Sequence, residues 1–219
     1  MAQIFHRSAN TLAPLTIVLV LLLGGGAVGG FYLFNKSPFV TRQNIVADQP
    51  VPFSHEHHVR GLGLDCRFCH TSVETGRTAG MPPTYTCMTC HSQVWTKAAI
   101  LEPIRESLAK KQPVHWQRVH DLPDFAFFDH SIHVNKGVGC VSCHGQVDKM
   151  PLPWRAQPLT MEWCLDCHRH PEQNLRPRDK ITDMDWQPEN QQELGPKLIQ
   201  QNGLETSLDR ITNCSTCHR

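Results

Sequence analysis

The sequence lacks a net charge of either sign. Its 21 Lys and Arg residues against 20 Asp and Glu residues give +1 over 219 residues, so nothing indicates a nucleic-acid partner or a chain held on anionic lipid. No stretch shows a persuasive β-strand pattern, and we therefore expect a fold that is mostly α-helical and irregular. No cysteine is left over for a disulfide, because all ten stand in pairs of one kind.

The ten cysteines make five copies of Cys-x-x-Cys-His. This is the attachment signature of a c-type haem, in which two thiols bond to the porphyrin and the adjacent histidine supplies one axial nitrogen to the iron. We therefore predict five covalently bound haem c groups. The predicted cofactor-binding residues are Cys66, Cys69, Cys87, Cys90, Cys140, Cys143, Cys164, Cys167, Cys214 and Cys217. The predicted proximal iron ligands are His70, His91, His144, His168 and His218.

A Cys-x-x-Cys pair has other uses besides haem attachment. One copy alone is typical of a redox dithiol or of half a zinc site. A zinc site needs cysteines grouped in fours with no fixed residue after them, and a disulfide framework gives no reason for the histidine. Five copies, each followed at once by His, favour haem.

The chain is short for the number of haems. After the apolar N-terminal segment about 37 residues serve each haem, too few for a conventional core around each cofactor. We infer a class III-like multihaem cytochrome c in which the haems form the core, wrapped by loops and short helices. Helices are expected over residues 92–111, with Pro103 starting a second helix after a break, and over 196–202, ended by Gly203 after a polar connector at 187–193.

An uncharged segment near the N-terminus predicts one transmembrane helix. Residues 8–35 carry no formal charge, and residues 12–34 are apolar and long enough to cross a bilayer. The small residues 27–29 also suit a cleaved secretory signal. We prefer an uncleaved anchor because the apolar run continues through residues 31–34.

The expected location is the inner (cytoplasmic) membrane, crossed once. Haem attachment to Cys-x-x-Cys-His takes place outside the bacterial cytoplasm, so the haem domain is expected on the periplasmic side. The numbers of Lys and Arg residues on either side of the apolar segment are nearly equal and do not decide the orientation. We expect residues 1–35 to form a cytoplasmic tip and transmembrane helix, 36–52 a linker, and 53–219 a periplasmic pentahaem domain.

The haem motifs show an internal repeat. They begin at positions 66, 87, 140, 164 and 214. The first two motifs form one closely spaced pair, the next two form a second pair, and the fifth stands alone. Each pair follows the same preface, Phe-x-His-x-x-His-Val, starting at Phe53 and at Phe128. We infer two-haem modules over 53–120 and 121–185 and a fifth haem over 186–219. The two phenylalanines are expected to pack on haem edges or in the core.

The prefaces supply the predicted distal ligands. His55 and His58, like His130 and His133, are spaced i, i+3 and share a face on a helical turn. Axial ligands stand on opposite sides of the porphyrin plane, so the two members of a pair must serve two different haems. For the fifth iron His120 is preferred over His115 and His170. Methionine is a rival ligand that would raise the haem potential, and the candidates are Met150 and Met161.

Long stretches of the sequence resemble a known family. These are FSHEHHVRGLGLDCRFCHTSVE, VHDLPDFAFFDHSIHVNKGVGCVSCHG and MEWCLDCHR. With the apolar N-terminal segment, they closely resemble the pentahaem cytochrome c subunit family (ActA) of bacterial alternative complex III. The resemblance implies an electron-transfer subunit of a membrane quinol oxidoreductase, without catalytic residues of its own.

The same resemblance implies partners. They are an iron–sulfur subunit, polytopic quinol-site subunits and a monohaem cytochrome c, with electrons passing to a periplasmic cytochrome c or a terminal oxidase. Two alternatives remain open. One is a membrane-anchored multihaem quinol dehydrogenase that acts on its own. The other is a reductase of nitrite or a related oxyanion, which is less favoured because no Cys-x-x-Cys-Lys motif for an open iron occurs.

Overall fold

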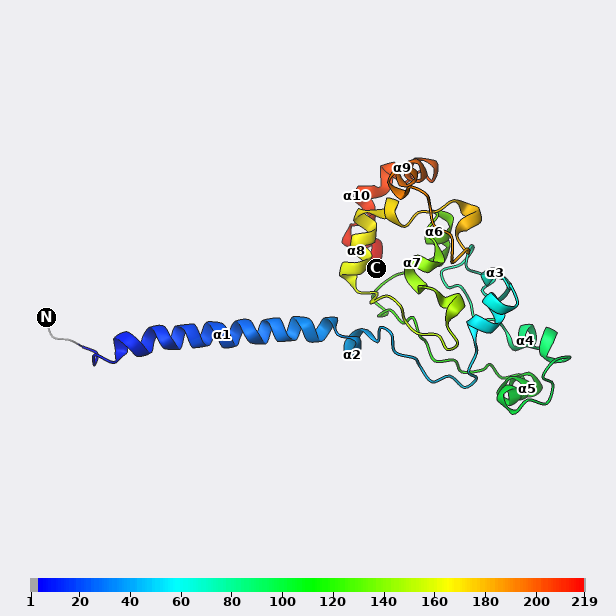
Figure 1. Cartoon of the computed structure of the whole chain (residues 1–219), viewed down its shortest axis with the longest axis horizontal. Coiled ribbons are helices and arrows are strands. Elements are labelled where there is room, and N and C mark those ends of the chain that lie inside the picture. The colour runs from blue at the N-terminus through cyan, green and yellow to red at the C-terminus, as the bar shows by residue number, and fades with distance from the viewer. Residues whose placement is uncertain (1–3, 219) are drawn as a thin grey trace. The chain divides into compact units, whose positions relative to one another are not determined.

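The computed structural model describes residues 4–218 and divides into two compact units, one ending at Arg42 and the other starting at Gln43. The first contains α1 (Ala9–Lys36), drawn in Figure 1 as one long helix, and α2 (Pro38–Thr41). An 18-residue window of α1 has a mean hydropathy of 2.2. At 1.5 Å per residue α1 exceeds the roughly 30 Å of bilayer hydrocarbon. A helix of this kind near an N-terminus suits both an anchor and a signal sequence.

Aromatic side chains gather where α1 ends. The Lys36 ammonium lies 4.6 Å from the centre of the Tyr32 ring, and the rings of Phe34 and Phe39 lie 5.7 Å apart. Phe39 is 79% exposed. Aromatic rings and a snorkelling lysine are typical of the membrane–water boundary, which is consistent with an apolar span ending near residue 36.

The second unit consists of short helices joined by loops. Residues 43–218 contain isolated β-bridges but no sheet. The α-helices are α3 (Cys66–Cys69), α4 (Thr84–His91), α5 (Glu102–Lys110), α6 (His130–Asn135), α7 (Cys140–His144), α8 (Met161–Arg169), α9 (Gln191–Gln201), α10 (Leu208–Ile211) and α11 (Cys214–Cys217). The single turns are the π-helical η1 (Glu56–Gly61) and the 3-10 turns η2 (Ala99–Leu101), η3 (Val147–Lys149), η4 (Pro171–Gln173), η5 (Arg178–Lys180) and η6 (Glu205–Ser207). The predicted fold class, mostly α-helical and irregular with one long apolar N-terminal helix, is confirmed.

The helix predicted over residues 92–111 was placed too early. Residues 92–98 form turns, and the helical part comprises only η2 and α5, with Pro103 in the first turn of α5. Trp95 has a left-handed backbone with φ 54°, which a right-handed helix does not accommodate.

The helix predicted over residues 196–202 starts earlier in the structure. The Asn190 side chain accepts hydrogen bonds from the backbone N–H groups of Gln192 and Glu193 and so caps α9 at its N-terminus. The connector therefore ends before Gln191. The C-terminal end agrees with the prediction, because α9 stops at Gln201 and Gly203 adopts a positive φ.

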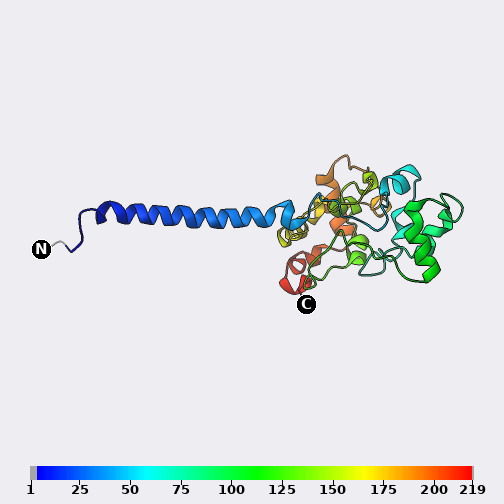
Figure 2. The same cartoon turned by 90° about the horizontal axis from the view of Figure 1, so that it is seen from below.

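Two small apolar clusters lie at opposite ends of the second unit. One contains Val51, Leu101 and Ile104 and packs around Cys87 in α4; the other contains Leu175, Leu198 and Ile199. In Figures 1 and 2, α4 and α5 lie at one end, and the C-terminal helices α10 and α11 lie toward the other.

Helix α5 offers a matched pair of substitutions. Ile104 is 3% exposed, whereas Leu108 on the same helix is 45% exposed. Ile104→Ala removes apolar contacts beneath α4 and should lower the free energy of unfolding by about 2–4 kcal/mol. Leu108→Ala should cost less than about 0.5 kcal/mol. Guanidinium titration of both variants, followed by far-UV circular dichroism, measures the difference; equal losses would mean that α5 is not packed as described.

Candidate haem-binding sites

Each Cys-x-x-Cys pair lies on a short helix. In α3, α4, α7, α8 and α11 the two cysteines stand three residues apart and therefore share a face. We number the sites by chain order, and each comprises two cysteines and the histidine that follows them. They are site 1 (Cys66, Cys69, His70), site 2 (Cys87, Cys90, His91), site 3 (Cys140, Cys143, His144), site 4 (Cys164, Cys167, His168) and site 5 (Cys214, Cys217, His218).

Most of the proximal histidines are fixed by one backbone hydrogen bond. A carbonyl oxygen can only accept, so in each case Nδ1–H donates and Nε2 keeps its lone pair for a metal. The contacts are His70 Nδ1 to Gly80 O at 2.8 Å, His91 to Val94 O at 3.2 Å, His168 to Ile211 O at 2.8 Å and His218 to Phe125 O at 3.1 Å.

Three predicted distal ligands make the same contact. Their Nδ1 atoms donate to carbonyls of their own preface or, for His130, of the loop after site 1. These are His58 Nδ1 to Ser54 O at 2.8 Å, His133 to Asp129 O at 2.7 Å and His130 to Arg77 O at 3.1 Å. In all three the Nε2 atom is left for a metal.

The spacing of the imidazole rings fits an iron between them. Two metal–nitrogen bonds of about 2 Å plus the radii of two imidazole rings separate ring centroids by roughly 6 Å. Three histidine pairs lie at this separation. They are His58 and His91 at 6.1 Å, His133 and His168 at 6.1 Å, and His130 and His144 at 6.4 Å. The residues at sites 2, 3 and 4 therefore fit a haem with histidine on both faces.

Two further predicted ligands are buried among these rings. His55 Nδ1 and His120 Nε2 are buried nitrogens without a hydrogen-bond partner. Burial is the largest cause that lowers the pKa of each to about 4, with His70 a further cause at His55 and Arg155 a further cause at His120. Burial likewise lowers the pKa of His144 to about 3. These imidazoles are neutral at physiological pH, as metal ligation requires.

The structure places His120 next to site 3. Its ring centroid lies 4.3 Å from that of His144, too close for an iron between the two. At site 5, the ring contact of His218 among the described residues is with Phe125, at 5.9 Å. The segment 120–127 connects these sites, because Phe127 N–H donates to Cys217 O at 2.7 Å.

The rival ligands differ in burial. His115 and His170 are exposed, and His170 Nδ1 lies 3.7 Å from a Glu172 carboxylate oxygen. Met150 is 2% exposed, as expected of a core side chain, whereas Met161 is 67% exposed.

The two prefaces have matching geometry. Phe53 stacks on His58 at 4.4 Å and meets His55 edge-on at 4.9 Å. Phe128 stacks on His133 at 4.6 Å and meets His130 edge-on at 4.8 Å. Each phenylalanine therefore holds two imidazoles at once. The sequence repeat identified these positions, but the contact with histidine was not anticipated.

Neighbouring sites share backbone and thiol contacts. Cys140 N–H donates to Ile181 O at 3.0 Å, and the adjacent Thr182 hydroxyl donates to Asp65, the N-cap of α3, at 3.2 Å. Burial raises the pKa of Cys140 to about 11, with the Cys66 thiolate the next cause. Site 1 therefore adjoins site 3.

The thiols connect the remaining sites in the same way. Burial raises the pKa of Cys143 to about 12, and the site 4 thiols are the next causes. Burial also raises the pKa of Cys87, and Cys69 is the next cause. The pKa of Cys164 is raised in the same way, with Cys217 as the next cause. The thiols that affect one another's pKa thus belong to sites 1 and 2, 3 and 4, and 4 and 5, and the His168 contact with Ile211 O joins site 4 to the helix before site 5.

A charged cluster beside these sites was missed by sequence reasoning. Arg60, on the same turn as His58, donates from Nη1 to Asp148 and to Asp185, each at 2.8 Å, and Lys149 lies 2.9 Å from Asp185. Asp148 is 4% exposed, and its Oδ1 has no partner. These residues have no motif in common, because they come from segments far apart in the chain.

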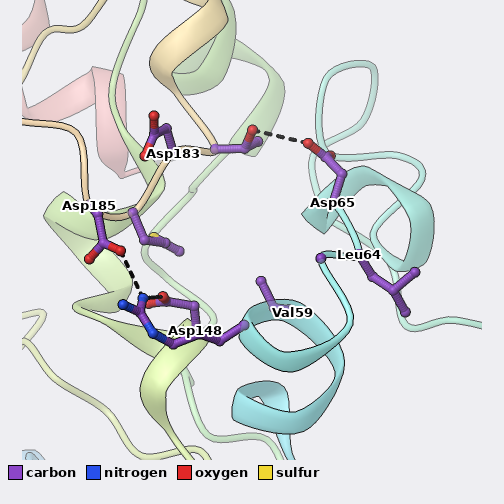
Figure 3. A pocket seen from close by; sticks show the side chains of 10 residues that line it. Val59, Leu64, Asp65, Asp148, Asp183 and Asp185 are labelled. Carbon is purple, nitrogen blue, oxygen red and sulfur yellow. Dashed lines mark hydrogen bonds and ion pairs between the residues drawn. The ribbon is translucent and has the colours of Figure 1, made fainter.

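The cluster borders an open pocket with a volume of about 580 Å³. Figure 3 shows Asp148 and Asp185 on one side of this pocket and Asp65 on the other. The Arg60 contacts therefore join the turn of the first preface, with its two predicted distal histidines, to η3 and to the segment after site 4.

Comparison with known proteins supports the haem assignment. Residues 126–219 match the family model of cytochrome c7 and related cytochrome c. The domain is cytochrome c7-like and carries five covalent haems. The predicted cofactors are thus confirmed, and the haem domain of such a c-type cytochrome lies on the periplasmic side. Residues 4–218 bring no three His, Cys, Asp or Glu side chains together as a metal site.

A curated relative covers most of the cytochrome. It is "Menaquinone reductase, multiheme cytochrome c subunit" of Nitratidesulfovibrio vulgaris (strain Hildenborough), 29% identical over 177 residues, which is 71% of this chain and 80% of the relative.

The charged cluster generates a stability prediction. Arg60→Gln should lower the melting temperature of the cytochrome, because it leaves the buried Asp148 carboxylate without its counter-charge. Arg118→Gln is the matched control: Arg118 pairs with Asp121 at 3.2 Å, but both side chains are exposed, and such pairs contribute little. Differential scanning calorimetry compares the two variants, and an Arg60→Gln protein as stable as the control would show that the cluster does not hold the segments together.

Proposed function

We propose that this cytochrome is the electron-transfer subunit of a membrane quinone oxidoreductase. The observation that carries the proposal is the set of histidine pairs spaced for an iron with both axial positions filled. Such an iron has no position for a substrate, so the chain needs no catalytic residue. The relative supports the setting, because its name places it as a multihaem subunit of a menaquinone reductase.

The proposed ligand set follows the geometry. His58 serves site 2, His130 serves site 3 and His133 serves site 4, as their ring distances support. His55 is assigned to site 1, because it lies beside His70 and the equivalent member of the second preface, His130, faces the first site of its own module. His120 remains the proposed ligand of the fifth iron. His144 already faces His130, so it is not available to His120, whose Nε2 has no hydrogen-bond partner. The segment after His120 reaches site 5, because Phe125 O accepts from His218 Nδ1.

The sites form a row whose order differs from the chain order. The η1 turn carries ligands for sites 1 and 2, and α6 carries ligands for sites 3 and 4. Between these pairs, the loop after site 1 packs on the second preface, since His130 N–H donates to Arg77 O at 3.0 Å. The His168 contact with Ile211 O joins site 4 to the helix before site 5. The proposed order is therefore site 2, site 1, site 3, site 4, site 5.

The residues of the chain perform three tasks at these sites. Each haem, once bound, supplies one-electron chemistry at its iron. The thioether cysteines fix the ring, the Nδ1–carbonyl hydrogen bonds orient both imidazoles, and Phe53 and Phe128 hold the distal pairs in place. Shared helices keep neighbouring sites close, as rapid electron transfer requires.

In its finer form, we propose that the cytochrome belongs to an alternative complex III and takes part in quinol oxidation. α1 then anchors it in the inner membrane, and its partners are an iron–sulfur subunit, polytopic quinol-site subunits and a monohaem cytochrome c. The long stretches that resemble the pentahaem subunit support this form. A second candidate, favoured by the curated relative, is electron transfer in the opposite direction, toward menaquinone.

His58 and His57 provide a direct test of the ligand set. His58→Ala should leave five haems attached but convert about one fifth of the ferric iron to high spin, because one axial ligand is lost. His57→Ala, at the exposed neighbouring position, should stay fully low spin. Electron paramagnetic resonance and mass spectrometry measure spin state and haem count. A His58→Ala protein without a high-spin signal would contradict the assignment.

Purification in mild detergent tests the assembly. An affinity-tagged cytochrome should co-purify with an iron–sulfur subunit and polytopic membrane subunits, identified by mass spectrometry. Electron transfer from a reduced quinol analogue through the purified assembly supports the alternative complex III direction, and net reduction of menaquinone supports the second candidate. A cytochrome that purifies alone and oxidises quinol would instead be a self-sufficient quinol dehydrogenase.

A further inference from the structure

One end of the row of sites carries an exposed aromatic pair. Trp95 is 63% exposed, and its ring stacks with that of the exposed His57 at 6.2 Å. His57 in turn meets His58, the proposed ligand at site 2, at 5.1 Å. A continuous set of rings therefore leads from the protein surface to the terminal site.

The turn that presents Trp95 is held by the site itself. Val94 O accepts the Nδ1–H of His91, and Ala98 N–H donates to Trp95 O at 3.0 Å. Trp95 keeps a left-handed backbone with φ 54°, an unfavourable conformation for a bulky residue that persists only where surrounding contacts enforce it. The backbone contacts of residues 94 and 95 enforce it here, so the turn that carries Trp95 is held next to site 2.

The charge around Trp95 has one predominant sign. Residues 92–111 contain four basic residues and two acidic residues in a chain whose net charge is only +1. Lys97 is exposed, and Arg105 is held in the same turn because its Nη1 donates to Ala98 O at 2.9 Å. Of the two acids, Glu106 is already paired with Lys110 at 2.8 Å. The other is Glu102, at the start of α5.

We propose that residues 92–111, which include the exposed Trp95 and Lys97 and the partly exposed Arg105, form the docking surface for an acidic one-electron carrier protein. A basic rim around an exposed tryptophan combines electrostatic steering with an aromatic anchor. The placement suits electron exchange, since a carrier docked here lies against the rings that end at site 2. The inference rests on the proposed function and adds to it the partner class and the place of contact.

Binding of a probe tests the docking surface independently of electron transfer. The full five-haem cytochrome in detergent is titrated with an acidic plant-type [2Fe–2S] ferredoxin by isothermal calorimetry at low and at high ionic strength. Binding should occur at low ionic strength and weaken as salt screens the charges. A basic cytochrome c should bind at least about tenfold more weakly. No ferredoxin binding at low ionic strength, or tighter binding of the basic probe, would overturn the proposal.

Substitutions localise the contact. Lys97→Glu and Trp95→Asn should each raise the ferredoxin Kd about tenfold or more; asparagine is chosen because it tolerates a left-handed backbone. Lys197→Glu is the control, with the same charge change on α9. If the control weakens binding as much as Lys97→Glu, or if neither surface variant changes the Kd, the docking site lies elsewhere. Haem absorbance and spin state, measured on each variant, report separately on the proposed function.

Discussion

The hydrogen bond from a histidine Nδ1–H to a backbone carbonyl is the interaction on which the rest of this structure depends. Seven imidazoles make it, among them both members of the pairs at sites 2 and 4. The bond selects the tautomer and fixes the ring plane, so Nε2 keeps its lone pair for a metal. Since each carbonyl belongs to a turn or a helix end, the backbone path itself is determined by where the ligands must point. This explains why the helices are short and why loops form so much of the domain.

A protein built in this way needs little apolar core of its own. The two clusters around Ile104 and Leu175 stand at the ends of the domain, and each serves a local purpose. The first supports α4 beneath Cys87, and the second packs α9 behind the helices that lead to site 5. Elsewhere in the domain most thiols and neutral imidazoles are partly buried, and such groups are costly to bury unless they bond to something. Burial raises thiol pKa values and lowers imidazole pKa values in this region, and both shifts favour the uncharged forms from which thioether and iron bonds arise.

The sequence predicted the sites more completely than the fold. Cys-x-x-Cys-His is local, so the five attachment positions could be found without any knowledge of tertiary structure. The prefaces also carry a local signal, because spacing of i, i+3 places two imidazoles on one turn. His120 has no such signal: its position beside His144 arises from the path of a loop, which pattern analysis does not reveal. The same holds for Arg60, whose carboxylate partners are 88 and 125 residues away in the chain, and for Trp95, whose left-handed backbone interrupts an otherwise plausible helix.

The duplication that we infer from the sequence repeat would explain why the proposed row of sites does not follow the chain. Each two-haem module places its first site next to the other module, as the contacts of Arg77 with the second preface and of Thr182 with Asp65 show. If two copies of such a module associate through their first sites, the second site of each copy is turned outward. Site 2 then becomes an end of the row, while site 4 is extended by the appended site 5. The charged contacts of Arg60 fall between the modules and hold them in this arrangement. When the modules join through their first sites, the haem-bearing turns lie in the interior. The second site of the first module, site 2, is then free to meet a partner.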